Sequence, residues 1–509
     1  MRIAVIGAGP AGLTSAKQAL ASGHDVVVFE AAGDVGGIWN PASGGAYDSV
    51  RMQSSRLSFP FSDHPPTADT PFPTLAEVHA YLRSYAERFE VLPRVRFRHR
   101  VDDVARTAEG WRVTAVTDDG RRASEPADAV MVASGELWEP RLPDRLPRPD
   151  SGVRVLHPKS YRGPGALAGD RVLVVGGGVS GADIASELAG VAASVDWSVR
   201  RRALFLPRTV GDSYNDALFS YAARIAVDDL GYDAYLDLLG ELVPEYLSAY
   251  RATGLLPKNG FHHAVHVNDT VVERIRSGAV RVVAAFDRFE DDGTAVLADG
   301  TSGRWDTVVL CLGYGMPDYA FLPFLDRRDL YEHHFWRYEP TLAVVNTPVD
   351  TEAFGTACPY FETIAGWVVA VLSGKAALPD AATMQRWCGD HMGQLDRRRH
   401  LDCWLETVRL GLLAGLLPDP RTAFDDYWRL VSSVVDPAHL ARPPDRAVPG
   451  RLDDRFDLAG MRVRVLAALA PQDRQALLRD GRISAADVAA ADAVPADRRL
   501  HPSLPYRQR

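Results

Sequence analysis

The sequence predicts an α/β fold of two domains, each built on a parallel β-sheet, with the second domain inserted in the first and a helical extension at the C-terminus. Two observations predict it: a strand, glycine-rich turn, helix and strand open the chain, and the same order returns from residue 171. The chain has 509 residues, which is room for about three domains. Hydrophobic residues make up 46% and charged residues 24%, a composition typical of globular proteins rather than of disordered or membrane-embedded chains.

Charge and cysteine content exclude several classes of partner. The net charge is -9 and no basic stripe dominates, so we expect no nucleic-acid partner. The four cysteines form no C-x-x-C pair and no metal-ligand spacing, which favours a reducing compartment and no metal site. The first apolar run is too short for a signal peptide, and no later run reaches about 18 residues. We therefore expect a cytoplasmic protein without a membrane partner.

The first unit predicts a Rossmann-like dinucleotide site. A buried strand at Ile3–Ile6 precedes a helix at Leu13–Leu20 and a second strand at Val26–Phe29. The turn between strand and helix is a G-x-G-x-x-G motif formed by Gly7, Ala8, Gly9, Pro10, Ala11 and Gly12. Such a turn lets the backbone approach a pyrophosphate at the helix N-terminus. Glu30, 18 residues after Gly12, can accept hydrogen bonds from both ribose hydroxyls, so the site suits an adenosine dinucleotide.

The second unit repeats this pattern with a different end. Strands at Arg171–Val175 and Val195–Val199 flank a glycine turn and a helix at Ala182–Leu188. To this site we assign Gly176, Gly178, Ser180, Gly181 and Asp183. No acid ends the second strand; Arg200 and Arg201 stand there instead, where guanidinium groups can bind a ribose 2'-phosphate. This predicts NADPH rather than NADH, the alternative being a solvated basic turn.

The two sites imply a pair of cofactors, FAD and NADPH, that exchange a hydride. Between them we expect a helix at Thr74–Glu90, strands at Val91–Val104, Trp111–Thr117 and Ala129–Ser134, and a hairpin turn at Asp118–Gly120. A strand at Val308–Leu312 is expected to return the chain to the first domain. The resulting division is an FAD-binding domain at 1–165 and 306–440, an inserted NADPH-binding domain at 166–305 with helices at about 210–260, and a helical extension at 441–509. In that extension, Pro471–Leu478 and the Ser484-x-x-Asp487 cap predict two short helices.

Several further segments resemble the class B flavin-containing monooxygenase family, of the dimethylaniline-monooxygenase kind. They are Gly36-Gly37-Ile38-Trp39, Tyr47–Val50, Phe61–Pro65, Val132–Gly135, Leu312-Gly313-Tyr314, and Ser198–Arg201 followed by Leu206–Arg208. The resemblance covers about residues 1–440. It implies that Gly37, Ile38, Trp39, Gly135, Gly313 and Tyr314 contact the cofactors.

The chain departs from the family pattern at three places. In the fingerprint F-x-G-x-x-x-H-x-x-x-F/Y, four residues separate Gly152 from His157, and Tyr161 stands where a Baeyer-Villiger enzyme usually carries Trp. Tyr161 favours oxygenation of a heteroatom, and His157 is interpreted as a domain-linker residue rather than a catalytic one. Gln53 replaces an Asn whose amide the family implies near the flavin and nicotinamide, so Gln53 is our catalytic candidate, with Ser54 beside it at the cofactor. Asn346 replaces a glycine at a strand end.

The resemblance implies a monooxygenase that forms a C4a-hydroperoxyflavin and transfers one oxygen atom from O2 to a nucleophilic nitrogen or sulfur. The expected partners are O2 and a small-molecule amine or sulfide. Alternatives are a Baeyer-Villiger monooxygenase acting on a ketone, and an NADPH oxidase or reductase flavoprotein; a disulfide reductase would need a redox-active cysteine pair. Residues 214–250 are expected to form a substrate lid or a packing pair of helices, and the tail a partner contact, such as that of a homodimer.

Overall fold

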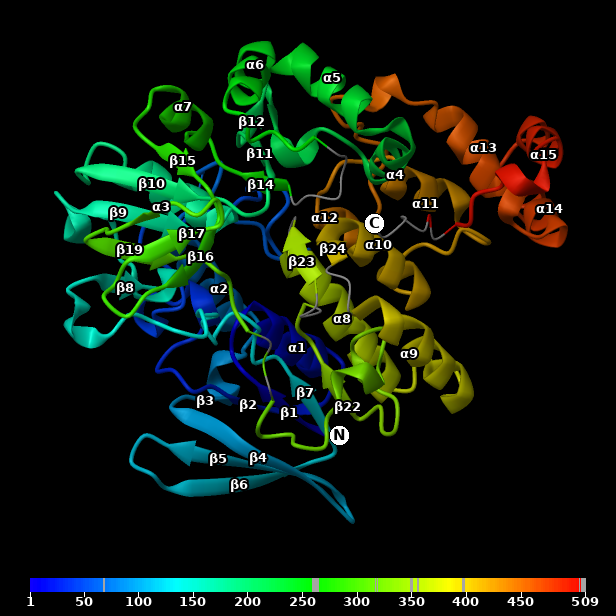
Figure 1. The fold of residues 1–509 in the computed structure, drawn as a ribbon. Helices are drawn as coiled ribbons and strands as arrows, with labels where there is room; N and C mark the ends of the chain where they lie inside the picture. Colours follow the sequence, from blue (N-terminus) through cyan, green and yellow to red (C-terminus); the bar gives the residue numbers. More distant parts are fainter. Residues whose placement is uncertain are drawn as a thin grey trace.

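Two parallel sheets organise the computed structural model, which describes residues 1–66, 69–258, 265–315, 317, 319–347, 351–354, 357–395, 399–502 and 504. The first sheet has the order β20-β21-β22-β7-β1-β2-β3 (Figure 1). Its strands are β1 (Arg2–Ile6), β2 (Asp25–Phe29), β3 (Val95–Arg96), β7 (Ala129–Val132), β20 (Leu330–Tyr331), β21 (Phe335–Trp336) and β22 (Leu342–Val344). The strands β22, β7, β1, β2 and β3 run parallel, and β1, β2 and β7 are apolar and buried, as the sequence predicts for a sheet covered on both faces.

The second sheet has the order β15-β10-β9-β19-β8, and all its pairings are parallel. Its strands are β8 (Arg154–Leu156), β9 (Arg171–Val175), β10 (Ser194–Ser198), β15 (Arg281–Val283) and β19 (Thr307–Leu310). Because β20–β22 follow β19 and join the first sheet, the second domain is inserted in the chain of the first, as predicted. The assignment of Val308–Leu312 to the first domain is wrong, since β19 pairs with β8 and β9. The inserted domain therefore begins before β8, earlier than residue 166, and includes β19.

Smaller elements surround the two sheets. An antiparallel sheet of β4 (His99–Thr107), β5 (Gly110–Thr117) and β6 (Arg122–Ala127) confirms the predicted hairpin. The single strand expected at Val91–Val104 is instead β3 and β4, separated by a turn in which Arg98 has a φ of 58°. Helix α2 (Leu75–Arg88) begins with a capping box between Thr74 and Glu77. A second small sheet joins β16 (Phe286–Phe289), β17 (Ala295–Leu297) and β18 (Ser302–Gly303).

The helices of the insertion pack against the inserted domain and against the C-terminal helices. Helices α4 (Tyr221–Leu230), α5 (Tyr232–Leu242) and α6 (Pro244–Ala252) form the predicted helical stretch. Tyr235 and Leu239 join the core of the inserted domain, whereas Tyr221 shares a core with Trp404 and Tyr427 of the C-terminal part. The side chains of Arg224 and Asp402 form an ion pair between these parts. This arrangement favours the packing interpretation of the helices over a free lid.

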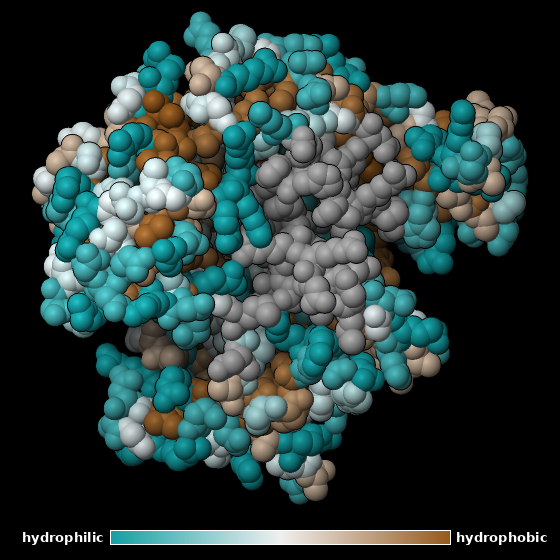
Figure 2. Space-filling model, in the orientation of Figure 1, coloured by the Kyte–Doolittle hydropathy of each residue, from teal (hydrophilic) through white to brown (hydrophobic). Residues whose placement is uncertain are grey.

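The C-terminal part is helical, as predicted. It contains α10 (Cys403–Leu413), α11 (Phe424–Val431), α13 (Leu458–Ala468), α14 (Pro471–Arg479) and α15 (Ala485–Asp492). The sequence does not predict helix α13, because Arg462 and Arg464 alternate with apolar residues, and this two-residue period is typical of a strand rather than a helix. Hydrophilic residues cover most of the described surface in Figure 2. Among the described residues, no helix combines the length and the apolar character that crossing a membrane requires. A homodimer contact through the tail stays a prediction.

Candidate functional site

The first glycine turn is built by two glycines that the fold requires and one that it does not. Gly7 has a φ of 103°, and a Cβ there would overlap the carbonyl oxygen of Ala133. A Cβ at Gly12 would overlap the carbonyl oxygen of Gly7, so helix α1 (Pro10–Ala21) could not pack this close to β1. Gly9 caps α1 with a φ of -75°, and its nearest neighbour would be 3.6 Å from an added Cβ. Packing therefore does not demand Gly9, whereas the close approach of a pyrophosphate would.

The residues around this turn are held in place by hydrogen bonds. Glu30 is buried directly after β2; its carboxylate accepts from the backbone N–H of Ala8 and of Ala32, each at 2.7 Å. The segment η1 (Gly37–Trp39), with Ile38 at its centre, lies on the same turn: a Cβ at Gly37 would be 3.0 Å from the Cα of Gly9. Thus the predicted residues Ala8, Pro10, Ala11, Glu30, Gly37, Ile38 and Trp39 belong to one region at the start of α1.

The second glycine turn has the same geometry. A Cβ at Gly176 would overlap the carbonyl oxygen of Cys311, and one at Gly181 that of Gly176. Gly178 caps helix α3 (Val179–Leu188), in whose first turn Ser180 lies, and an added Cβ would have only His266 Nε2 near it, at 4.0 Å. The fold therefore needs the outer glycines, while Gly178 leaves the helix N-terminus approachable.

The arginine segment lies against this second turn. A Cβ at Gly177 would be 2.6 Å from the carbonyl oxygen of Arg201. Arg200 and Arg201 are exposed, and within the described ranges neither side chain forms an ion pair or hydrogen bond. The neighbouring Arg202 lines a cavity of about 280 Å³ together with Arg251 and Lys258, two cations that no pattern in the sequence singles out. A cationic surface thus stands where the sequence predicts a 2'-phosphate.

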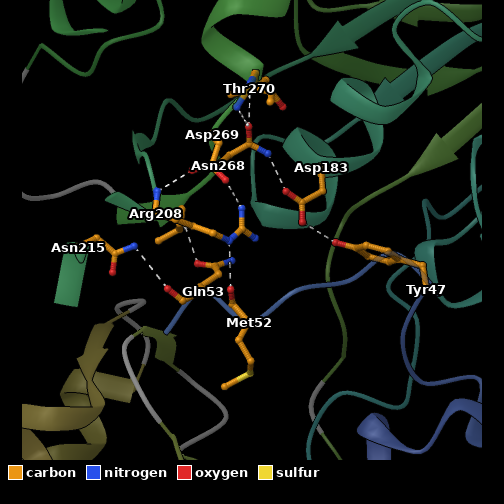
Figure 3. Close-up of polar contacts among 11 residues, drawn as sticks. Tyr47, Met52, Gln53, Asp183, Arg208, Asn215, Asn268, Asp269 and Thr270 are labelled. Atoms are coloured by element: carbon orange, nitrogen blue, oxygen red, sulfur yellow. Dashed lines mark hydrogen bonds and ion pairs between the residues drawn. The ribbon is translucent and has the colours of Figure 1, made fainter. Parts of the chain in front are cut away.

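Asp183, which the sequence assigns to the second site, lies in α3 at the contact between the domains. Its half-buried carboxyl accepts hydrogen bonds from Tyr47 Oη at 2.8 Å and from Asn268 Nδ2 at 2.7 Å (Figure 3). Burial raises the pKa of Asp183 and also that of Tyr47. Because Tyr47 precedes the inserted domain and Asp183 lies within it, this carboxyl connects the two domains.

Gln53 lies in a loop of the first domain that contacts the inserted domain (Figure 3). Its Oε1 accepts from the backbone N–H of Val267 at 3.3 Å, and its backbone carbonyl accepts from Asn215 Nδ2 at 3.5 Å. Its amide nitrogen makes no hydrogen bond with the residues that the structure describes, so it is available as a donor. Ser54 is buried beside it. The amide of Gln53 is therefore anchored by its oxygen between the domains.

Two further groups hold this loop, and the sequence predicts neither contact. Arg208, in the segment that resembles a phosphate-binding one, pairs with Asp269 at 2.6 Å and donates from Nε to the carbonyl oxygen of Met52 at 3.4 Å. Asp216 accepts from the backbone N–H of Ser55 at 2.6 Å and from the hydroxyl of Ser58 at 2.5 Å. Only the folded chain brings these residues together.

His157, which follows β8 in the inserted domain, holds the connection that leaves this domain after β19. His157 Nε2 donates to the carbonyl oxygen of Gly313 at 3.1 Å, while Nδ1 accepts from the backbone N–H of Lys159. The ring of Tyr314 packs edge-on against His157, with centroids 5.0 Å apart. Burial lowers the pKa of His157, which favours this neutral form. The contacts of His157 are structural ones within and beside the inserted domain, and Gly313 and Tyr314 lie in the connection that follows β19.

Asn346 fills the position at which the resemblance leads one to expect glycine. Its Oδ1 accepts from the backbone N–H of Gly135 and its Nδ2 donates to Tyr319 Oη, both at 3.1 Å. Gly135 has a φ of 75°, which suits glycine. Hence Asn346 fixes the turn after β7 to the end of β22.

Comparison with known proteins agrees with this architecture. The family model described as flavin-binding monooxygenase-like matches residues 1–409. Flavin-containing monooxygenase 5 of Rattus norvegicus is 30% identical over 469 residues, which cover 83% of this chain and 86% of that protein. A 4-hydroxybenzoate brominase (decarboxylating) of Marinomonas mediterranea is 30% identical over 351 residues, which cover 66% of this chain and 67% of that protein.

Solved structures share the fold. The S-allyl-L-cysteine S-oxygenase of Allium sativum has a TM-score of 0.55 at 20% identity and covers 97% of this chain and 96% of its own. A cyclohexanone monooxygenase of Rhodococcus sp. Phi1, bound to NADP+, has a TM-score of 0.58 at 18% identity. The match covers 77% of this chain and 89% of that one. With two glycine turns in two sheets and a family match over most of its length, this chain belongs to the flavin-binding monooxygenase-like family, whose members use FAD and NADPH, as the sequence predicted.

Proposed function

We propose that this monooxygenase transfers one oxygen atom of O2 to a nucleophilic nitrogen or sulfur of a small molecule, through a C4a-hydroperoxyflavin. The observation that carries the proposal is the loop of Gln53, which lies between two domains that each present an approachable glycine turn. Dinucleotides at Gly9 and at Gly178 would meet at this interface, where a hydride can pass between them.

The residues present fit both cofactors. Gly9 and Gly178 leave the two helix N-termini approachable, Glu30 stands where a ribose would bind, and Arg200 and Arg201 stand where a 2'-phosphate would bind. When bound, FAD supplies the activation of O2 and NADPH supplies the hydride. The chain itself binds, orients and shields these groups.

The preference for nitrogen or sulfur rests on the relatives and on Tyr161. A human relative, 29% identical, is named putative dimethylaniline monooxygenase [N-oxide-forming] 6, and the Allium sativum protein is an S-oxygenase. The Tyr161 side chain is buried, donates to Glu187 Oε2 at 3.1 Å and packs edge-on against Tyr47. It belongs to the packing of the inserted domain, so its influence on the substrate would be indirect.

The test is anaerobic reduction of the flavin with NADPH and with NADH, followed by O2 and by one amine, sulfide, ketone or phenol with bromide. We expect faster reduction by NADPH and an oxygenated flavin adduct that amines or sulfides discharge, giving one N-oxide or S-oxide per NADPH consumed. An ester or lactone from the ketone would identify a Baeyer-Villiger enzyme, and a brominated phenol would identify a halogenating one. Release of peroxide with every substrate would contradict the proposal.

Replacement of Gln53 by alanine is expected to slow reduction of the flavin by NADPH about tenfold, because the anchored amide donor between the domains is lost. Single-turnover absorbance measures this rate. Gln53→Asn retains an amide and should recover part of it. Met52→Leu is the matched control, since Met52 contacts Arg208 through its backbone carbonyl. An unchanged rate in Gln53→Ala would remove the catalytic assignment.

A further inference from the structure

The side of the first glycine turn opposite Glu30 carries a second set of polar residues. Strands β22, β7 and β1 run parallel with Val344, Val132 and Ile6 in register, so their carboxyl ends share one edge of the sheet. Glu30 marks the adenosine end beside β2, on one side of β1. A dinucleotide bound with its adenosine at Glu30 would extend to the opposite side, over the ends of β7 and β22. The residues after these two strands would then lie beside its redox-active half.

Glu136 stands at this place and is fixed by both strand ends. It follows Gly135, whose backbone N–H is held by Asn346. The hydroxyl of Thr347, the residue after Asn346, donates to Glu136 Oε1. The same Asn346 also donates to Tyr319. The Thr347 hydroxyl thus orients one oxygen of this half-buried carboxyl, and Asn346 fixes the backbone just before it.

The surroundings of this carboxyl lack a compensating cation among the described residues. Burial raises the pKa of Glu136 to about 7, although the Thr347 hydroxyl and the residue's own backbone N–H act to lower it. Two other titratable groups interact with it electrostatically, Tyr319 and Cys403. Burial raises the pKa of Tyr319 to about 12 and that of the Cys403 thiol well above its usual value, so both stay neutral. Of these three groups, Glu136 alone changes charge near neutrality.

We propose that Glu136, oriented by Thr347, holds the proton that each turnover consumes at the flavin site. The proposal rests on the monooxygenase function proposed above. In that reaction NADPH gives a hydride, the O–O bond breaks, one oxygen atom joins the substrate, and the other leaves as water. The water takes up the hydride-derived hydrogen and one proton. Glu136 supplies this proton as the carboxylic acid and regains it from solvent.

The state of Glu136 is tested first by infrared titration of the flavin-loaded protein between about pH 5 and pH 9. We expect a protonated-carboxyl band that disappears near pH 7, is absent in Glu136→Gln and persists in Glu139→Gln. Glu139 is the matched control, because it is an exposed glutamate three residues further along the same connection. A spectrum unchanged by Glu136→Gln would overturn the proposal.

The role is tested by the rate at which O2 reoxidises the reduced flavin, measured without substrate. In the parent protein this rate should fall as the pH rises through 7. In Glu136→Gln it should be at least about tenfold lower at pH 6 and independent of pH over this range. Equal rates for the two proteins at pH 6 would contradict the proposal.

Thr347→Val keeps the inference testable if Glu136→Gln fails to fold. Loss of the Thr347 hydrogen bond should raise the pKa of Glu136 further, and move both the infrared titration and the fall in rate to higher pH. If neither the infrared titration nor the fall in rate moved in Thr347→Val, the result would contradict the proposed roles of Glu136 and Thr347. Neither readout requires an oxygenated product. Failure to oxygenate amines and sulfides would therefore refute the proposed function, whereas these two measurements would still decide the role of Glu136.

Discussion

Gly12→Ala is expected to give a protein that binds little FAD and is destabilised by about 3 kcal/mol. The added methyl group would overlap the carbonyl oxygen of Gly7, which belongs to the backbone and cannot rotate away. Helix α1 would have to move off β1, and both belong to the central core of the first domain. Thermal unfolding and the flavin content of the purified protein measure the two effects.

Gly9→Ala is the matched control. Its methyl group would meet nothing closer than 3.6 Å, and the φ of -75° suits alanine, so the unfolding temperature should be unchanged. The methyl group would still obstruct the approach of a pyrophosphate, so FAD should bind much more weakly. Tight FAD binding by Gly9→Ala would show that no cofactor comes close to this position. A Gly12→Ala protein with normal stability would show that α1 and β1 can separate at little cost.

The double variant Arg200→Ser/Arg201→Ser is expected to raise the KM for NADPH about 10- to 100-fold and leave that for NADH unchanged. Both guanidinium groups are exposed beside the second glycine turn and form no ion pair within the described part of the chain. Their removal should therefore not affect stability. Steady-state kinetics with the two nucleotides measure the preference.

The corresponding double lysine variant separates charge from geometry. Lysine keeps the positive charge and loses the planar fork that binds two phosphate oxygens, so an intermediate KM for NADPH is expected. An equal rise in the KM for NADPH and the KM for NADH in the serine variant would show that the arginines contact some other part of the nucleotide. In that case Arg202, Arg251 and Lys258, which share one cavity, would be the next residues to replace.

Local patterns made the two glycine turns predictable, because a strand, a turn and a helix that follow one another in sequence also lie together in space. The contacts of Gln53 with Val267 and of Ser58 with Asp216 were beyond prediction, since each joins residues more than 150 positions apart. The misassignment of β19 has a related cause. A buried apolar run shows that a strand lies inside a parallel sheet, and two such sheets are available to it.

The contacts between the domains are of two kinds. The chain crosses between the sheets twice, and backbone hydrogen bonds join the two crossings, from the N–H of Arg141 to the Gly313 carbonyl oxygen and from the N–H of Gly315 to the Glu139 carbonyl oxygen. On the inserted domain, Asp183, Asp216 and Val267 hold the loop of the first domain through separate hydrogen bonds. Each of these three bonds depends on one side chain, that of Asp183, Asp216 or Gln53, so single substitutions would remove them one at a time. The bonds between the crossings join backbone groups, so no such substitution would remove them.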